Sequence, residues 1–164
     1  MVSGGRLELA LPAGTTDGAE VRTQSTYRYG SYRARIQVAD APSSITGFFL
    51  YAPPDYESEI DVELFNDPHG AVMFTTYARG AQTHTERRSL GFDPTAAMHE
   101  YRFDYGPGSV SFLVDGVLLR TWTTGVPSAA MNLYLNAWFP AWPAGTAPTE
   151  RRATLVDSVE FRPR

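Results

Sequence analysis

The stretch Glu57-Ser58-Glu59-Ile60-Asp61-Val62-Glu63-Leu64 decides how the rest of the chain is interpreted. Successive side chains of a β-strand point to opposite faces, so residues two apart share a face. Ile60, Val62 and Leu64 then form an apolar face that suits a core. The opposite face carries four acidic residues in one row: Glu57, Glu59, Asp61 and Glu63. In a confined cleft, repulsion between them would raise some of their pKa values. The fold gains no stability from such a row, so the row indicates a chemical role for these carboxyl groups.

A solvated outer face is the ordinary explanation for charged residues on an alternating strand. Two features favour a cleft instead. The row is uniformly acidic, whereas the surface of a soluble protein mixes both signs of charge. The chain also has 13% aromatic residues, which supply the stacking surfaces that a carbohydrate cleft needs.

Composition bounds the class of protein. The 164 residues suit one domain, and a hydrophobic content of 43% excludes a disordered chain. A formal net charge of −4 argues against a nucleic-acid partner, and Arg87-Arg88 and Arg151-Arg152 are typical of ordinary surface pairs. Without cysteine, disulfides and thiolate metal sites are excluded. The chain as given shows neither a signal peptide nor a transmembrane segment.

Short alternating or apolar runs, broken by Gly, Pro, Asp and Ser, take the place of helical periodicity. They predict strands over residues 6–11, 20–26, 31–39, 46–52, 57–65, 71–78, 83–90, 99–106, 109–114, 117–123, 131–138 and 153–161. The Asp115-Gly116 pair between apolar runs predicts a type I′ hairpin turn. Many short strands without helices indicate an all-β fold, an antiparallel β-sandwich or barrel, in one domain over residues 1–164.

The acidic row contains the minimal machinery for hydrolysing a glycosidic bond. One carboxylate acts as nucleophile or base, and a second carboxyl group protonates the leaving oxygen. Glu59 and Glu63 lie roughly 13 Å apart between Cα atoms in an extended strand. Whether their carboxyl groups approach the roughly 5–5.5 Å of a retaining enzyme is not fixed by spacing. Asp61 between them supplies a charge that separates their pKa values. Calcium is the chemical alternative, although one straight strand face cannot surround the ion.

The segment Ser58-Glu59-Ile60-Asp61-Val62-Glu63 resembles the E-I-D-x-E signature of glycoside hydrolase family 16, in the form found in lichenases (β-1,3-1,4-glucanases). Further segments resemble the family in the same order, and the match extends from about Gly4 to Phe161. They are residues 4–11, 19–23, 29–32, 47–51, 90–93, 99–101, 112–116 and 131–138. The resemblance implies a concanavalin-like jelly roll.

Carried over residue by residue, the resemblance implies that Glu59 is the nucleophile, Glu63 the acid/base and Asp61 an assisting carboxylate. It also implies retention of configuration. Six more residues become candidate sugar contacts: Glu20, Arg22, Tyr51, Tyr77, Asn136 and Trp138. Arg22 can instead be a surface residue of its strand and Tyr51 a core residue. Trp138 and Trp142 lie near turn residues and are favoured as cleft rings.

No cofactor is required for this chemistry. Relatives hold a structural calcium through backbone oxygens near the termini and an aspartate that Asp157 resembles, so the resemblance implies a calcium site there. Two departures from the family pattern affect the cleft. Lichenases usually have Trp two residues before the nucleophile, where this chain has Glu57, and the family's F-N-x-Y reads Phe74-Thr75-Thr76-Tyr77, which loses an amide contact. The family's N-terminal strand and substrate-binding loop are also absent, which means a minimal enzyme with an open cleft or a shortened chain.

The acidic row together with the family resemblance therefore implies a retaining endo-glycoside hydrolase that cleaves β-1,3-1,4- or β-1,3-linked glucan by double displacement. Two alternatives remain open: a transglycosylase on the same scaffold, and a carbohydrate-binding jelly roll without turnover. We expect a polysaccharide or oligosaccharide partner, no nucleic-acid or membrane partner, and a monomer. The family resemblance implies an extracellular protein.

Overall fold

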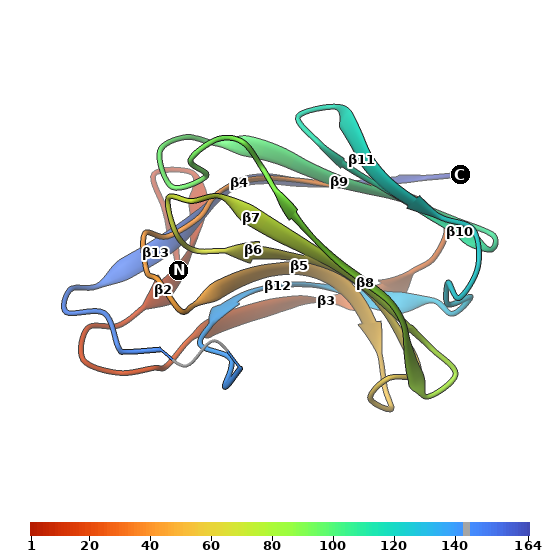
Figure 1. The fold of residues 1–164 in the computed structure, drawn as a ribbon, viewed down its shortest axis with the longest axis horizontal. Coiled ribbons are helices and arrows are strands. Elements are labelled where there is room, and N and C mark those ends of the chain that lie inside the picture. The colour runs from red at the N-terminus through yellow and green to blue at the C-terminus, as the bar shows by residue number, and fades with distance from the viewer. Residues whose placement is uncertain (143–144) are drawn as a thin grey trace.

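The computed structural model describes residues 1–142 and 145–164, which form thirteen β-strands (Figure 1). The strands are β1 (Val2–Ser3), β2 (Arg6–Leu11), β3 (Ala19–Tyr27), β4 (Gly30–Gln37), β5 (Ile45–Ala52), β6 (Ser58–Phe65), β7 (Ala71–Ala78), β8 (Ala81–Ser89), β9 (His99–Gly106), β10 (Ser109–Val114), β11 (Val117–Trp122), β12 (Met131–Trp138) and β13 (Arg152–Pro163). Within the described residues, no helix is long and apolar enough to cross a membrane.

The strands form two antiparallel sheets that pack face to face (Figure 1). One sheet has the order β1-β2-β13-β4-β9-β10-β11, and the other has the order β3-β12-β5-β6-β7-β8. This confirms the predicted all-β jelly roll. Each predicted strand lies within two residues of an observed strand at both ends, and only the two-residue β1 was not predicted. The six-stranded sheet curves so that its outer face is concave, and the acidic strand β6 lies in its interior.

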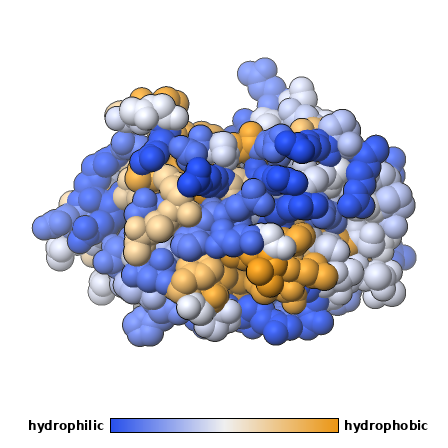
Figure 2. Space-filling model, turned by 90° about the horizontal axis from the view of Figure 1, so that it is seen from above, coloured by the Kyte–Doolittle hydropathy of each residue, from blue (hydrophilic) through white to orange (hydrophobic). Residues whose placement is uncertain are grey.

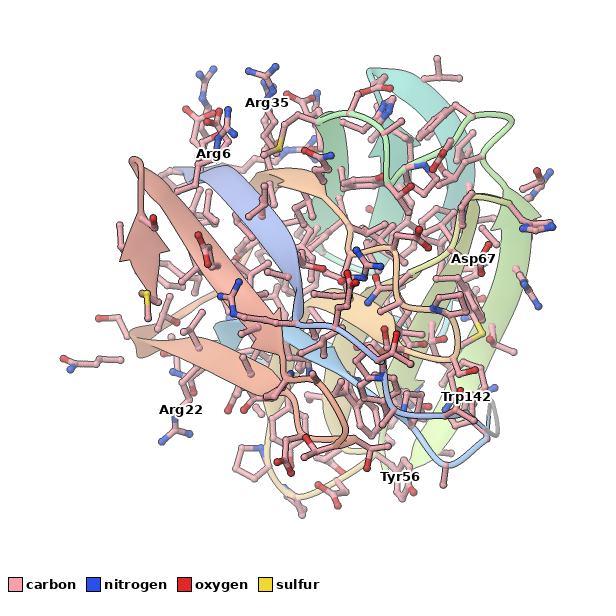
Figure 3. All side chains as sticks on the ribbon, turned by 90° about the vertical axis from the view of Figure 1, so that its left-hand side faces the viewer. Arg6, Arg22, Arg35, Tyr56, Asp67 and Trp142 are labelled. Carbon is pink, nitrogen blue, oxygen red and sulfur yellow. The ribbon has the colours of Figure 1, made fainter. Side chains whose placement is uncertain are left out.

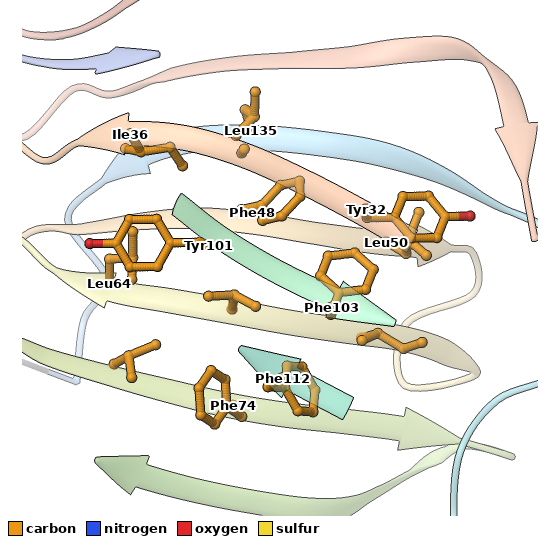
Figure 4. Close-up of a cluster of buried hydrophobic side chains, with 14 of the residues drawn as sticks. Tyr32, Ile36, Phe48, Leu50, Leu64, Phe74, Tyr101, Phe103, Phe112 and Leu135 are labelled. Atoms are coloured by element: carbon orange, nitrogen blue, oxygen red, sulfur yellow. The ribbon is translucent and has the colours of Figure 1, made fainter. Parts of the chain in front are cut away.

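The core lies between the sheets, where the inward-facing apolar side chains of both sheets meet. In β4, Ala34 and Ile36 are buried. Aromatic rings from opposite sheets interlock there: Phe74 of β7 stacks on Phe112 of β10 with 4.5 Å between the ring centroids (Figure 4). Burying one such ring contributes about 1.5–3 kcal/mol. Ile60, Val62 and Leu64 of β6 are also fully inside this core, which fixes the acidic side chains on the outer face.

A buried polar network links Asn66, which directly follows β6, to residues of both sheets. The Thr46 hydroxyl donates to Oδ1 of Asn66 over 2.8 Å and lies 2.7 Å from the Thr154 hydroxyl of the opposite sheet. Asn66 in turn donates from Nδ2 to the Ser44 hydroxyl over 2.8 Å. Since each of these groups has a partner, the network costs little desolvation and links β5, β6 and β13.

The face of the seven-stranded sheet is mostly hydrophilic (Figure 2). Apolar patches interrupt it, and exposed apolar side chains of β11 include Val117 and Leu118. The turn between β10 and β11 has φ values of 48° at Asp115 and 78° at Gly116. Two consecutive positive φ angles are those of a type I′ turn, which confirms the predicted hairpin.

Candidate active site

The three acids of β6 lie in consecutive cross-strand rows on the concave sheet. Each acid is flanked by one residue of β5 and one of β7. Glu59 lies between Tyr51 and Tyr77, and Glu63 lies between Gly47 and Met73. In the middle row, Asp61 pairs with Phe49 and Thr75. The prediction that Glu59, Asp61 and Glu63 share one face is confirmed by this register.

A groove of about 350 Å³ covers these acids. Its lining residues come from β5, β6, β7, β12 and two loops: Gly47, Phe49, Tyr56, Glu59, Asp61, Glu63, Tyr77, Asn136, Trp138 and Trp142. Tyr56 precedes the start of β6, while Trp142 contacts Phe65 at the end of β6. Both side chains stand on the concave side of the sheet (Figure 3). The groove between these two walls therefore runs across the strands.

Burial in the groove raises the pKa of all three carboxyl groups. Desolvation raises the pKa of Glu59 to about 7, with a smaller contribution from the charge of Asp55. Desolvation, followed by the charge of Glu59, raises the pKa of Glu63 to about 7. Asp61 is 6% exposed, and desolvation together with both neighbouring glutamates holds its pKa well above the usual range. At neutral pH the groove therefore retains protons that exposed carboxyl groups would have lost.

A hydrogen bond between Asp61 and Glu59 distinguishes the two glutamates. The bond lowers the pKa of Glu59 and raises that of Asp61, so Asp61 holds the proton and donates it to the Glu59 carboxylate. Glu59 is thus the first to ionise, and its charge then favours the protonated form of Glu63. This is the charge distribution that a nucleophile and a general acid require.

Four of the six candidate sugar contacts line the groove or its extension. Tyr77, Asn136 and Trp138 line the groove itself. A second hollow of about 340 Å³ continues past Asn136 and Trp138 to Glu20. There, Asn136 donates from Nδ2 to Glu20 over 3.3 Å and accepts from the backbone N–H of Gly47 over 3.1 Å. A Cβ atom on Gly47 would lie 2.5 Å from the Asn136 amide oxygen, so only glycine leaves this amide in place.

The other two candidates lie on the same sheet outside the groove lining. Arg22, on the edge strand β3, donates to the Tyr134 hydroxyl over 3.3 Å. Tyr51 donates to Oδ1 of Asp55 over 2.6 Å, and this bond raises its pKa to about 12. Tyr51 is half-buried on the concave sheet and does not belong to the core.

Glu57 does not belong to the acidic row. The strand starts at Ser58, and Glu57 is exposed and lines a different hollow with Ser58 and Arg79. The prediction of four acids on one face is wrong because the chain turns before β6. Tyr56 has a φ of 66° there, which turns its side chain toward the groove. The Pro53-Pro54-Asp55 run is a loop signal that could have shown where the strand begins.

Tyr56 was missed by the sequence analysis. Tyr56 is 56% exposed, and its ring lies 5.4 Å from the Tyr77 ring, tilted by 44°. The backbone carbonyl of Tyr56 accepts from Gly80 over 3.1 Å, and that of Glu57 accepts from Arg79 over 3.1 Å. A non-glycine residue with positive φ is uncommon and persists where its surroundings hold it. The groove therefore has an aromatic ring beside Glu59. Tyr56 contributes this ring, and it directly precedes Glu57, the position at which lichenases usually have Trp.

Asp157, the predicted calcium ligand, is paired with two arginines. Its two carboxylate oxygens face Nε of Arg6 at 3.5 Å and a terminal nitrogen of Arg35 at 3.6 Å. A calcium ion is bound by oxygen atoms that carry negative charge or dipoles. Two guanidinium groups at this carboxylate neutralise it and repel a further cation. The calcium site implied by the family resemblance stays a prediction.

Fold and groove together define a class: a jelly-roll sandwich with paired carboxyl groups in an open groove on its concave sheet, an arrangement used by glycoside hydrolases. The family profile "Glycosyl hydrolases family 16" matches residues 1–157. The chain belongs to this family, as the sequence analysis predicted.

Individual relatives agree with this assignment. A beta-glucanase of Bacillus amyloliquefaciens is 36% identical over 144 residues, which cover 84% of this chain and 60% of that protein. A beta-glucanase of Paenibacillus polymyxa is 35% identical over 140 residues, which cover 82% of this chain and 59% of that protein. The solved beta-glucanase of Bacillus licheniformis superimposes with a TM-score of 0.90 at 29% identity, covering all of this chain and 81% of that one. The chain thus spans about 60% of the length of the curated relatives it matches.

Proposed function

We propose that this chain is a retaining endo-glycoside hydrolase that cleaves a β-1,3-1,4- or β-1,3-linked glucan. The observation that carries the proposal is the set of three carboxyl groups with raised pKa values in one groove, with Asp61 hydrogen-bonded to Glu59. The beta-glucanase relatives support glucan as the substrate class. A groove that runs across the strands suits a polysaccharide bound along its length and cleaved internally.

In the first step, the Glu59 carboxylate attacks the anomeric carbon and forms a covalent glycosyl ester. The bond from that carbon to the leaving oxygen breaks, and protonated Glu63 transfers its proton to this oxygen. Asp61 keeps its proton and donates a hydrogen bond to Glu59, which orients the nucleophile.

In the second step, the Glu63 carboxylate takes a proton from water, and the water oxygen attacks the anomeric carbon. The ester bond breaks, Glu59 leaves as a carboxylate, and the configuration is retained because two inversions have occurred. These groups and water balance both steps, so the proposed chemistry needs no cofactor. Since its polymeric substrate would lie outside cells, we also propose an extracellular location.

The test is reducing-end release from barley β-glucan, laminarin and xyloglucan. Wild-type protein is expected to release reducing ends from at least one β-glucan, and Glu59→Gln to lose at least 10³-fold in kcat, the order expected for loss of a covalent nucleophile. Adding azide to Glu59→Ala should restore turnover and give an inverted glycosyl azide. Wild-type activity in Glu59→Gln would contradict the nucleophile assignment.

Product analysis separates the two rival functions. A transglycosylase would transfer the glycosyl group to an added oligosaccharide acceptor and produce longer chains instead of reducing ends. A binding module would retain the polysaccharide without cleaving it. Three intact carboxyl groups in the groove favour turnover, since binding alone does not require them.

A further inference from the structure

Arg87 of β8 stands at the edge of the groove floor, in the same cross-strand row as Glu63. The register pairs Glu63 with Met73 of β7, and Met73 with Arg87. Neighbouring strands lie about 4.8 Å apart, so the Cα atoms of Glu63 and Arg87 are separated by roughly 10 Å. Side chains alternate along β8, so Arg87 shares the concave face with Glu63 while Arg88 points to the other face. Arg87 therefore lies where the groove reaches the β8 edge of the sheet.

An aromatic ring holds the Arg87 guanidinium in place. Its Cζ atom lies 4.1 Å from the centroid of the Phe65 ring, within the range of a cation–π interaction. Phe65 is 8% exposed and packs against Ile45 and Ala71. Its ring meets that of Trp142 at 72°, with 5.8 Å between the centroids. Since Trp142 lines the groove, the stack of Arg87, Phe65 and Trp142 connects the β8 edge to the groove wall.

The guanidinium of Arg87 keeps its hydrogen-bond donors free. Nearby Arg88 of β8 and Arg120 of β11 both form ion pairs with Glu86 of β8. Within residues 1–142 and 145–164, Arg87 has neither an ion pair nor a side-chain hydrogen bond. A guanidinium stacked on a ring directs its N–H groups sideways in its own plane, where they can bind two oxygen atoms at once.

We propose that Arg87 is a substrate-binding residue that holds one sugar unit of the polysaccharide at the β8 end of the groove. This proposal rests on the proposed function, because it places the sugar chain across the strands. The bound group is a pair of neighbouring oxygen atoms, either adjacent hydroxyls of a neutral sugar or the oxygens of an anionic substituent. Given its separation from Glu63, Arg87 contacts a sugar beyond the two that flank the cleaved bond. Long substrates gain from this contact and short ones do not.

Arg87→Met tests the contact. Methionine is unbranched and can still pack on Phe65, but it offers no donor. The control is Arg88→Met, which changes the neighbouring arginine on the opposite face of the strand. We expect Arg87→Met to lower kcat/KM about 10-fold through KM on barley β-glucan, on its carboxymethylated form or on both, the loss typical of a hydrogen bond to a charged group. A chromogenic glycoside of a disaccharide should be cleaved at the wild-type rate by both variants.

The choice of polymer identifies the bound group. An equal loss on neutral and carboxymethylated β-glucan assigns hydroxyls, whereas a loss confined to the carboxymethylated polymer assigns an oxyanion. Affinity electrophoresis in the same polymers measures binding without cleavage, so the role of Arg87 is tested even if no glucan is hydrolysed. If Arg87→Met shows the same electrophoretic retardation and the same KM as the wild type on both polymers, this proposal is overturned and the proposed function stands. Absence of cleavage by the wild type would overturn the proposed function alone.

Discussion

At the scale of single residues, Glu59 and Glu63 are chemically similar and differ in their neighbours. Both have a pKa raised to about 7 by burial. Only Glu59 accepts a hydrogen bond from Asp61, and this bond favours its ionised form. The proposed reaction needs Glu59 ionised and Glu63 protonated at the same time. The fraction of molecules in that state is greatest near neutral pH.

We therefore expect a bell-shaped dependence of kcat/KM on pH, with a maximum near pH 7 and losses on both sides. Below the maximum Glu59 is protonated and cannot attack, and above it Glu63 has no proton to transfer. Glu63→Gln assigns the alkaline limb when it is tested on a dinitrophenyl glycoside, whose leaving group needs no proton. In this variant kcat/KM should keep its acid limb and become constant at high pH. An alkaline limb that survives in Glu63→Gln would contradict the assignment of the general acid.

At the scale of elements, β9 offers a matched pair of buried tyrosines. Tyr101 and Tyr105 both point into the core with 0% exposure. The Tyr105 hydroxyl donates to the carbonyls of Pro127 and Ala129 over 3.0 and 3.1 Å. In the described part of the chain, the Tyr101 hydroxyl has no partner. Tyr105→Phe should therefore lower the free energy of unfolding by about 1–2 kcal/mol, while Tyr101→Phe should leave it unchanged or raise it.

Urea unfolding at pH 7 measures both variants under the same conditions. The two substitutions remove the same atom from the same strand, so a difference between them reports the hydrogen bonds and not the loss of volume. A larger loss of stability for Tyr101→Phe than for Tyr105→Phe would contradict the prediction.

The strands could be predicted from the sequence because their period of two is a local property, whereas the groove could not. β7, for example, was predicted with its observed bounds. The pairing of Glu63 with Met73 and Arg87 depends on register between strands, which no local pattern contains. Arg87 consequently looked like half of an ordinary surface pair. Tyr56 was missed because its role depends on a positive φ in the loop before β6.

At the scale of the whole molecule, the groove places a local cost on folding. Three carboxyl groups that would ionise freely in the unfolded chain are held in a site where burial opposes their charge. The rest of the sandwich offsets this cost through a core that spans both sheets. The burial of carboxyl groups on β6 that serves the proposed reaction thus lowers the stability of the fold.

The cost should appear as a dependence of stability on pH. Glu59 and Glu63 have pKa values of about 7 in the folded protein, against 4.5 as the ordinary value. Between these values the folded state binds more protons than the unfolded state, so the free energy of unfolding falls as pH rises through this window. Glu63→Gln removes one of these groups. It should raise the free energy of unfolding at pH 8 by about 1–3 kcal/mol and change it little at pH 4.

Glu57→Gln is the matched control, because Glu57 lies two residues before Glu59 but is exposed and outside the groove. Its free energy of unfolding should equal that of the wild type at both pH values. Stabilisation by Glu63→Gln that is as large at pH 4 as at pH 8 would show that the carboxyl group is not held protonated in the folded groove. Stabilisation confined to pH 8 would show that the acidic strand lowers the stability of the fold through the groups proposed to act in the reaction.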